Sequence, residues 1–179
     1  MTTRQIIPPV AMAVSIEAAR RAARTSGTAL DAELTDKVRA YTEAAEHKTR
    51  RAFITQTWAV TLDEFPPAIP LARPPIISVL AVKYHDTAGA LQTLDPQAYI
   101  VDSASEPGCI VPATGGSWPV TAKCPNAVQV QYTCGYGPSP DDVPAAIRQY
   151  ILGMVENDYF PSAGAQFLCR LLDRARVYP

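Results

Sequence analysis

The spacing of the apolar residues changes twice along this 179-residue chain, and these changes limit the folds that it can adopt. Before Arg51 the apolar residues recur at helical spacing, whereas from Ile54 to Leu62 they recur at every second position. The clearest alternation is Val128 to Cys134, and helical spacing returns after Asp141. The sequence therefore predicts an α+β fold, in which helices from the N- and C-terminal segments form a bundle and the middle is a β-rich insert.

Two helices are expected before the strands. Ser15 has the side chain of an N-cap, so a first helix is predicted from there to about Arg24. Thr28 and Asp31 form a capping-box-like start to a longer helix that ends near Arg51. The apolar face of this second helix comprises Leu30, Leu34, Val38, Tyr41 and Ala45.

Prolines and glycines divide the middle of the chain into short strands. Ile69 to Leu71 lies between two Pro-Pro pairs, which suits an edge strand because proline has no backbone donor. Ile76 to Tyr84 and Leu91 to Leu94 flank a turn and are predicted to form a hairpin. Residues 99–101 and 109–111 are predicted to form two further short strands. Residues 112–126 are an irregular loop around Trp118, whose side chain either packs within the subunit or contacts a neighbour.

The C-terminal part is expected to be helical again. Asp141 to Pro144 has the acids and the proline of a helix start. After Tyr159, a last helix has apolar residues at positions i, i+1, i+4, i+5 and i+8, namely Phe167, Leu168, Leu171, Leu172 and Ala175. This face either folds back onto the core of the subunit or binds a groove on a partner, and the pattern leaves both open.

Composition and motifs argue against catalysis and against sequence-specific DNA binding. The formal net charge is −1, and a nearly neutral chain lacks the field that holds nucleic acid by phosphate neutralisation. The two histidines, His47 and His85, share no motif with a nucleophile, and no phosphate-binding or metal-binding motif occurs. The four cysteines have no C-x-x-C spacing and are expected to be reduced, mostly buried thiols. The chain is therefore not expected to be an enzyme or to hold a cofactor or metal.

Short motifs in a consistent order resemble the head-tail connector (adaptor) proteins of long-tailed bacteriophages and of gene transfer agents. They are Val14–Ala18, Arg51–Trp58, Leu71–Val79, Leu94–Tyr99, Gly115–Pro119, Tyr132–Gly137 and Val143–Gln149. The resemblance implies one connector domain over residues 1–179, with N-terminal helices in 14–52, a β-rich insert in 53–137, a helix in 141–159 and a C-terminal helix or arm in 164–179.

The resemblance also implies a function and partners. Such a chain would form a ring, twelvefold by resemblance, that docks under the portal protein, extends the DNA channel and presents a platform for the next tail-proximal protein. It would stay in the cytoplasm until it joins the virion, and DNA would pass without sequence-specific binding. The expected portal contacts are Phe167, Leu168, Leu171, Leu172 and Tyr178. Trp118 and Tyr136 are candidates for a contact with a neighbouring subunit or with the tail side.

Two alternatives remain at this stage. A tail-completion or stopper protein would share the ring symmetry but contact the connector in place of the portal. From a different class, a small cytoplasmic enzyme would use Cys109, Cys124 or Cys134 as a nucleophile with His85 nearby.

Overall fold

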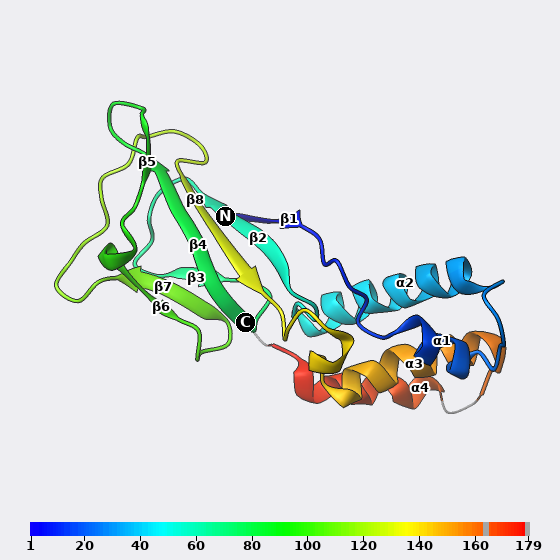
Figure 1. Cartoon of the computed structure of the whole chain (residues 1–179). Coiled ribbons are helices and arrows are strands. Elements are labelled where there is room, and N and C mark those ends of the chain that lie inside the picture. Colours follow the sequence, from blue (N-terminus) through cyan, green and yellow to red (C-terminus); the bar gives the residue numbers. More distant parts are fainter. Residues whose placement is uncertain (163–164, 178–179) are drawn as a thin grey trace. The chain divides into compact units, whose positions relative to one another are not determined.

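The computed structural model describes residues 1–162 and 165–177 of the chain (Figure 1). These residues divide into two compact units. One unit comprises residues 1–8 and 56–135 and contains the β-strands, and the other comprises residues 9–55 and the described residues from 136 onward and contains the α-helices.

The strand unit is built around a five-stranded antiparallel sheet with the order β1-β2-β8-β4-β5 (Figure 1). Its strands are β1 (Thr2–Ile7), β2 (Gln56–Leu62), β8 (Val128–Cys134), β4 (Ile76–His85) and β5 (Leu91–Thr93). Two irregularities in the pairing of β4 with β8 leave Ile77 and Leu80 as extra residues, and these side chains are 50% and 55% exposed. Such bulges turn a side chain away from the regular alternation of a strand.

The alternation in β8 produces one buried and one partly exposed face, as its sequence predicts. Val128, Val130, Tyr132 and Cys134 are buried, whereas the residues between them are half-buried. The hydroxyl of Tyr132 donates a hydrogen bond to the carbonyl of Ala72 at 2.9 Å, so the buried face is covered by the chain that follows β3.

A second, three-stranded antiparallel sheet completes this unit, with the order β3-β7-β6. Its strands are β3 (Ile69–Leu71), β7 (Gly108–Pro112) and β6 (Tyr99–Asp102), and the 3-10 turn η1 (Pro96–Ala98) precedes β6. The edge position of β3 and the hairpin of β4 with β5 confirm the predictions from the prolines and the turn residues.

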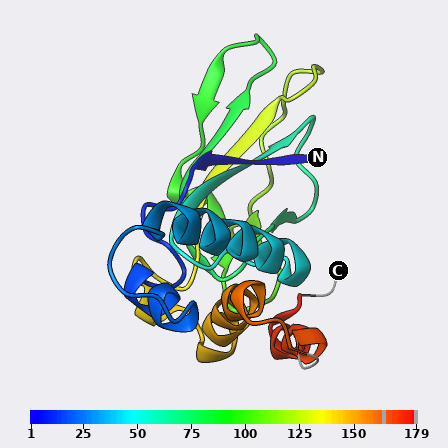
Figure 2. The same ribbon diagram turned by 90° about the vertical axis from the view of Figure 1, so that its right-hand side faces the viewer.

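The helical unit contains α1 (Ile16–Ala22), α2 (Asp31–Thr49), α3 (Ala145–Tyr159) and the single-turn α4 (Ala165–Leu168), which Figure 2 shows from a second side. Two 3-10 segments, η2 (Pro140–Asp142) and η3 (Cys169–Ala175), precede α3 and follow α4. The core includes Leu34 and Val38 of α2, Ile147 and Ile151 of α3, and Phe53. The Ser15 side chain accepts a hydrogen bond from the Ala18 backbone, which confirms the predicted N-cap.

The expected helical bundle with a β-rich insert is wrong. Within the described residues the chain has eight strands in two antiparallel sheets and four α-helices, so it is a sheet-rich α+β protein. The N-terminal segment is not only helical, because β1 at the start of the chain pairs with β2 along its length. The sequence concealed β1 because five of its six residues are exposed, which leaves no apolar alternation to detect.

Two local expectations also need correction. The second helix begins at Asp31 after Leu30, and no side chain caps it. Thr28 is therefore not its cap, and Asp31 instead forms an ion pair with Arg20. The expected last helix is α-helical only to Leu168 and continues as a 3-10 segment. Its end is held by a hydrogen bond from the Arg51 Nε to the Ala175 carbonyl at 2.6 Å.

Candidate functional site

The structure divides the expected portal contacts into buried and exposed side chains. Leu172 is fully buried in the core of the helical unit, whereas Phe167 is 51% and Leu171 is 37% exposed. Leu168 is half-buried and packs against that core. The fifth residue, Tyr178, lies outside the described residues.

Leu168 and Leu172 attach this segment to its own unit. A Cβ added at Gly153 in α3 would lie 2.7 Å from a methyl carbon of Leu168, so the leucine occupies the space that a side chain on α3 would need. The C-terminal surface is our name for four of the exposed residues, Phe167, Arg170, Leu171 and Arg174; Gln166 and Asp173 of the same segment are exposed as well. The Arg170 guanidinium lies 4.9 Å from the centroid of the Phe167 ring. The C-terminal surface thus combines two exposed apolar side chains with two cations, which suits an apolar partner surface with carboxylates nearby.

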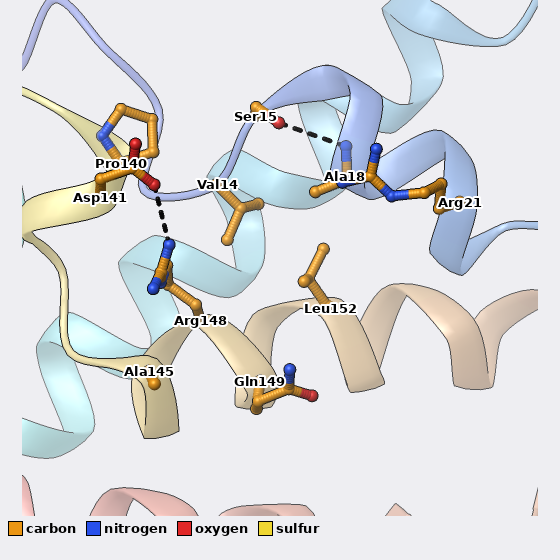
Figure 3. Close-up of a pocket in the computed structure, with 10 residues that line it drawn as sticks. All are labelled: Val14, Ser15, Ala18, Arg21, Pro140, Asp141, Ala145, Arg148, Gln149 and Leu152. Atoms are coloured by element: carbon orange, nitrogen blue, oxygen red, sulfur yellow. Dashed lines mark hydrogen bonds and ion pairs between the residues drawn. The ribbon is translucent and has the colours of Figure 1, made fainter.

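A groove of about 410 Å³ lies between α1, η2 and α3, and we call it the α1–α3 groove (Figure 3). Val14 and Leu152 give it an apolar base, and Arg21 and Arg148 are the cations among its lining residues. The Arg148 Nη1 donates to the Asp141 carboxylate at 3.0 Å, and this aspartate is largely exposed. The groove therefore suits an apolar side chain with a polar flank.

The sequence did not predict the α1–α3 groove because its walls are distant along the chain. The sequence predicted roles for Ser15 and Asp141, but only as residues at the starts of two helices. The Ser15 hydroxyl is engaged in capping α1. The residues that line the groove include no histidine or cysteine that could pair with Ser15 in nucleophilic catalysis.

Trp118 belongs to a small aromatic cluster in the strand unit. Its ring stacks on Phe65 with centroids 4.8 Å apart and an interplanar angle of 9°, and Phe65 meets Tyr84 edge to face at 5.7 Å. The Trp118 Nε1 is buried and has no hydrogen-bond partner among the described residues. The cluster packs the loop of residues 112–126 against its own unit, and the indole N–H stays buried without a hydrogen-bond partner among the described residues.

Tyr136 lies in the helical unit, half-buried against its core. Its backbone N–H donates to the carbonyl of Phe53 at 3.0 Å. The phenol ring therefore fills space beside the core, and part of it stays accessible.

The cysteines and His85 are dispersed. Cys134 is buried and its Sγ donates to the carbonyl of Gln56 at 3.8 Å, Cys109 and Cys169 are half-buried, and Cys124 is exposed, so the expectation that most thiols are buried is wrong. The His85 Nδ1 lies 3.2 Å from the carbonyl of Gly89 in the same turn. Over residues 1–162 and 165–177 no cluster of three potential metal ligands occurs, and no helix has the length and apolarity to cross a bilayer.

Comparison with known proteins gives a match in fold. No protein-family model and no curated protein matches the chain. Among solved structures, it is similar to a chain in the neck of an empty gene transfer agent (GTA) particle computed with C6 symmetry. The TM-score is 0.82 at 21% sequence identity, and the match covers 100% of this chain and 97% of that chain. A chain in the virion of a native GTA particle matches with the same values.

A third structure, the neck of a native GTA particle computed with C12 symmetry, matches with a TM-score of 0.71 and 23% identity. That match covers 97% of this chain and 96% of that chain. The similarity extends over both units in each case, so the whole chain shares the fold of chains found in these particles. The resemblance to gene transfer agents is therefore supported at the level of the fold.

Proposed function

We propose that this chain is a structural virion protein of the head-tail junction, where it forms an adaptor ring between the portal and the tail. The observation that supports this function is the full-length match to chains in GTA neck and virion structures. In the three comparisons the match covers at least 96% of this chain and of the matched chain. A match of that extent includes the order and the sizes of the elements in both units. A single common module, such as one sheet, would match only in part.

The same comparisons support a ring. Two of the matching structures were computed with C6 and C12 symmetry. A head-to-tail contact between unlike surfaces closes into a ring when the rotation that relates neighbouring subunits is a whole fraction of a full turn. We propose a twelvefold ring for this chain, and each contact between neighbours should bury roughly a thousand Å² or more in total.

For the portal contact we propose Phe167 and Leu171 of the C-terminal surface. Leu172 is buried in the core of the helical unit and attaches the C-terminal segment to it. Arg170 and Arg174 flank the two apolar side chains, so we expect carboxylates on the facing surface of the portal. Trp118 and Tyr136 remain proposed contacts to a neighbour or to the tail side.

The test is to remove the gene from its source particle system and to image the particles by electron microscopy, with complementation as the control. DNA-filled or leaking heads beside free tails are expected, and normal tailed particles would refute the proposal. A tail-completion role would instead leave the connector ring visible on the head.

The portal contact is tested by complementation with two variants. Phe167→Asp combined with Leu171→Asp should leave the subunit folded, because both side chains are exposed, yet it should not restore head-tail joining. The control is Leu172→Ala, which removes a fully buried side chain and should lower the free energy of unfolding by about 2–5 kcal/mol. If the double variant restores joining, the C-terminal surface is not the portal contact.

The structural role is proposed in place of a thiol-dependent enzyme. Cys134 is buried under the sheet, and His85 is engaged with its own turn. A thiol reagent should therefore modify the exposed Cys124 first and reach Cys134 only on unfolding. A cysteine that reacts much faster at neutral pH than an ordinary exposed thiol, Cys124 included, would favour the enzyme.

A further inference from the structure

One face of the five-stranded sheet has a set of polar side chains beside alanines and the exposed Ile7 and Leu91, and its strands contain no carboxylate. The strand pairing places Lys83 opposite Gln129, and it places Thr61 opposite both Gln129 and Thr2, so these four side chains form one row across the sheet. A second row on the same face contains Arg4, Ala59, Gln131 and Ala81. We call the set Thr2, Arg4, Thr61, Lys83, Gln129 and Gln131 the polar sheet face.

This face is partly exposed and hollowed: Thr2 and Arg4 are exposed, and the other four residues of the set are half-buried. A hollow of about 480 Å³ lies on it, lined by side chains that include Arg4, Thr61, Lys83 and Gln129. Hydroxyl groups and amides can donate hydrogen bonds to an anion, and the two cations can neutralise its charge.

Within the described residues, no ion pair is formed by the cations of the polar sheet face. In the part of the chain that the structure describes, neither Arg4 nor Lys83 forms an ion pair, and β1, β2, β4, β5 and β8 contain no aspartate or glutamate. Asp63 and Asp86 follow strand ends, and both carboxylates accept backbone hydrogen bonds, from Asn126 and from Ala88 and Ala90. The strands thus present positive charge although the chain has a formal net charge of −1.

We infer that the polar sheet face binds the phosphate backbone of double-stranded DNA without reading its sequence. Backbone contacts of this kind use Arg, Lys, Thr and Gln side chains and have no base specificity. A single strand is a poorer fit because it needs aromatic stacking platforms. Trp58 is paired with Tyr132, and Tyr84 is paired with the buried Val128, so these aromatic residues belong to the opposite face.

This inference rests on the proposed function for its setting, since an adaptor ring encloses the path of DNA. Two cations per chain make the contact weak, and a weak contact suits a wall past which DNA must move. With two phosphates neutralised per chain, the slope of log K against log salt should be about −1.8. That slope corresponds to a roughly twelvefold loss of affinity between about 50 and 200 mM salt.

The test is an NMR titration of the ¹⁵N-labelled chain with a short mixed-sequence duplex at low salt. Amide shifts should concentrate on β1, β2, β4 and β8 at the polar sheet face, with the salt slope given above. Arg4→Gln combined with Lys83→Gln should abolish both the shifts and the salt dependence. The matched control is Arg39→Gln combined with Lys48→Gln in α2, which changes the net charge equally and should bind as the parent does.

Three results would overturn the inference. They are the absence of shifts at low salt, an equal loss of binding in the two double variants, and shifts of the same amides by polyglutamate of equal charge that are as large as those caused by the duplex. The last result would mean that the face binds an acidic protein surface. Each of them leaves the gene-deletion phenotype unaffected, so a failure of this inference is distinguishable from a failure of the adaptor proposal.

Discussion

Replacing Gly153 by alanine tests whether the C-terminal segment is docked on its own helical unit. Gly153 lies in the interior of α3, where alanine is more favourable than glycine by about 1 kcal/mol. In this structure the new Cβ would lie 2.7 and 3.0 Å from the two terminal methyl carbons of Leu168. Both distances are shorter than ordinary carbon contacts, so Leu168 must move, and such overpacking costs about 1–3 kcal/mol.

The two effects oppose each other, so the sign of the change depends on Leu168. With Leu168 present, Gly153→Ala should be neutral or should lower the free energy of unfolding by up to about 2 kcal/mol. In a Leu168→Ala background the crowded methyl groups are gone, and the same substitution should raise the free energy of unfolding by about 1 kcal/mol. The coupling between the two sites should therefore be about 1–3 kcal/mol.

Urea unfolding followed by helical circular dichroism measures each corner of this cycle. Leu171→Ala is the control background, because Leu171 is exposed and the three atoms nearest to the added Cβ at Gly153 all belong to Leu168. If Gly153→Ala stabilises the parent and the Leu168→Ala protein equally, α4 is not packed on α3. The assignment of Leu168 as an inward residue and of Phe167 and Leu171 as outward residues would then be wrong.

Two further predictions concern the helical unit. Gly137→Ala should destabilise it by roughly 1–3 kcal/mol in urea unfolding, because the new Cβ would lie 2.7 Å from the Cβ of Asp142, whose carboxylate closes the capping box of η2. Burial alone would raise the pKa of Asp158, but hydrogen bonds from Lys37 and Tyr41 outweigh it and hold this pKa below its ordinary value. Ionised Asp158 therefore contributes to the free energy of unfolding above its unfolded pKa, and this contribution is lost as the pH falls through its folded pKa. In a series of unfolding curves at decreasing pH, Asp158→Asn should remove the part of the stability loss that is due to this group.

Local signals in the sequence predicted most of the regular structure. The alternation of β8, the cap at Ser15 and the prolines around β3 each depend on a few adjacent residues, and each prediction is confirmed. The β1 strand could not be predicted in this way, because it is an exposed edge whose only partner, β2, begins 49 residues after β1 ends. Its presence is a property of the sheet and not of its own sequence.

In the candidate sites too, local sequence signals predicted some features, whereas others depend on residues that are distant along the chain. The spacing of Phe167, Leu168, Leu171 and Leu172 identified an apolar segment, but adjacent residues on a helix cannot be sorted into inward and outward ones without the packing partner. Here that partner is α3 with its Gly153. The polar sheet face was missed for a related reason, because the net charge of the chain conceals that Arg4 and Lys83 lie on one face of the sheet while the acids of that unit lie mostly in turns.

The chain shares a fold over its full length with a protein of only 21% sequence identity. The physical reason for this also indicates which residues are candidates for a functional role. A core retains its fold under extensive substitution when the pattern and the volume of its apolar residues are kept, so positions such as Leu34, Val130 and Ile151 limit the fold but not the exact residues. Surface residues in an assembly have to fit only their own neighbours, so they can diverge together with those neighbours. If the chain has the proposed adaptor function, the side chains that carry it should therefore be sought among accessible residues that the fold does not require, such as the exposed Phe167, Leu171 and Arg4 and the half-buried Lys83.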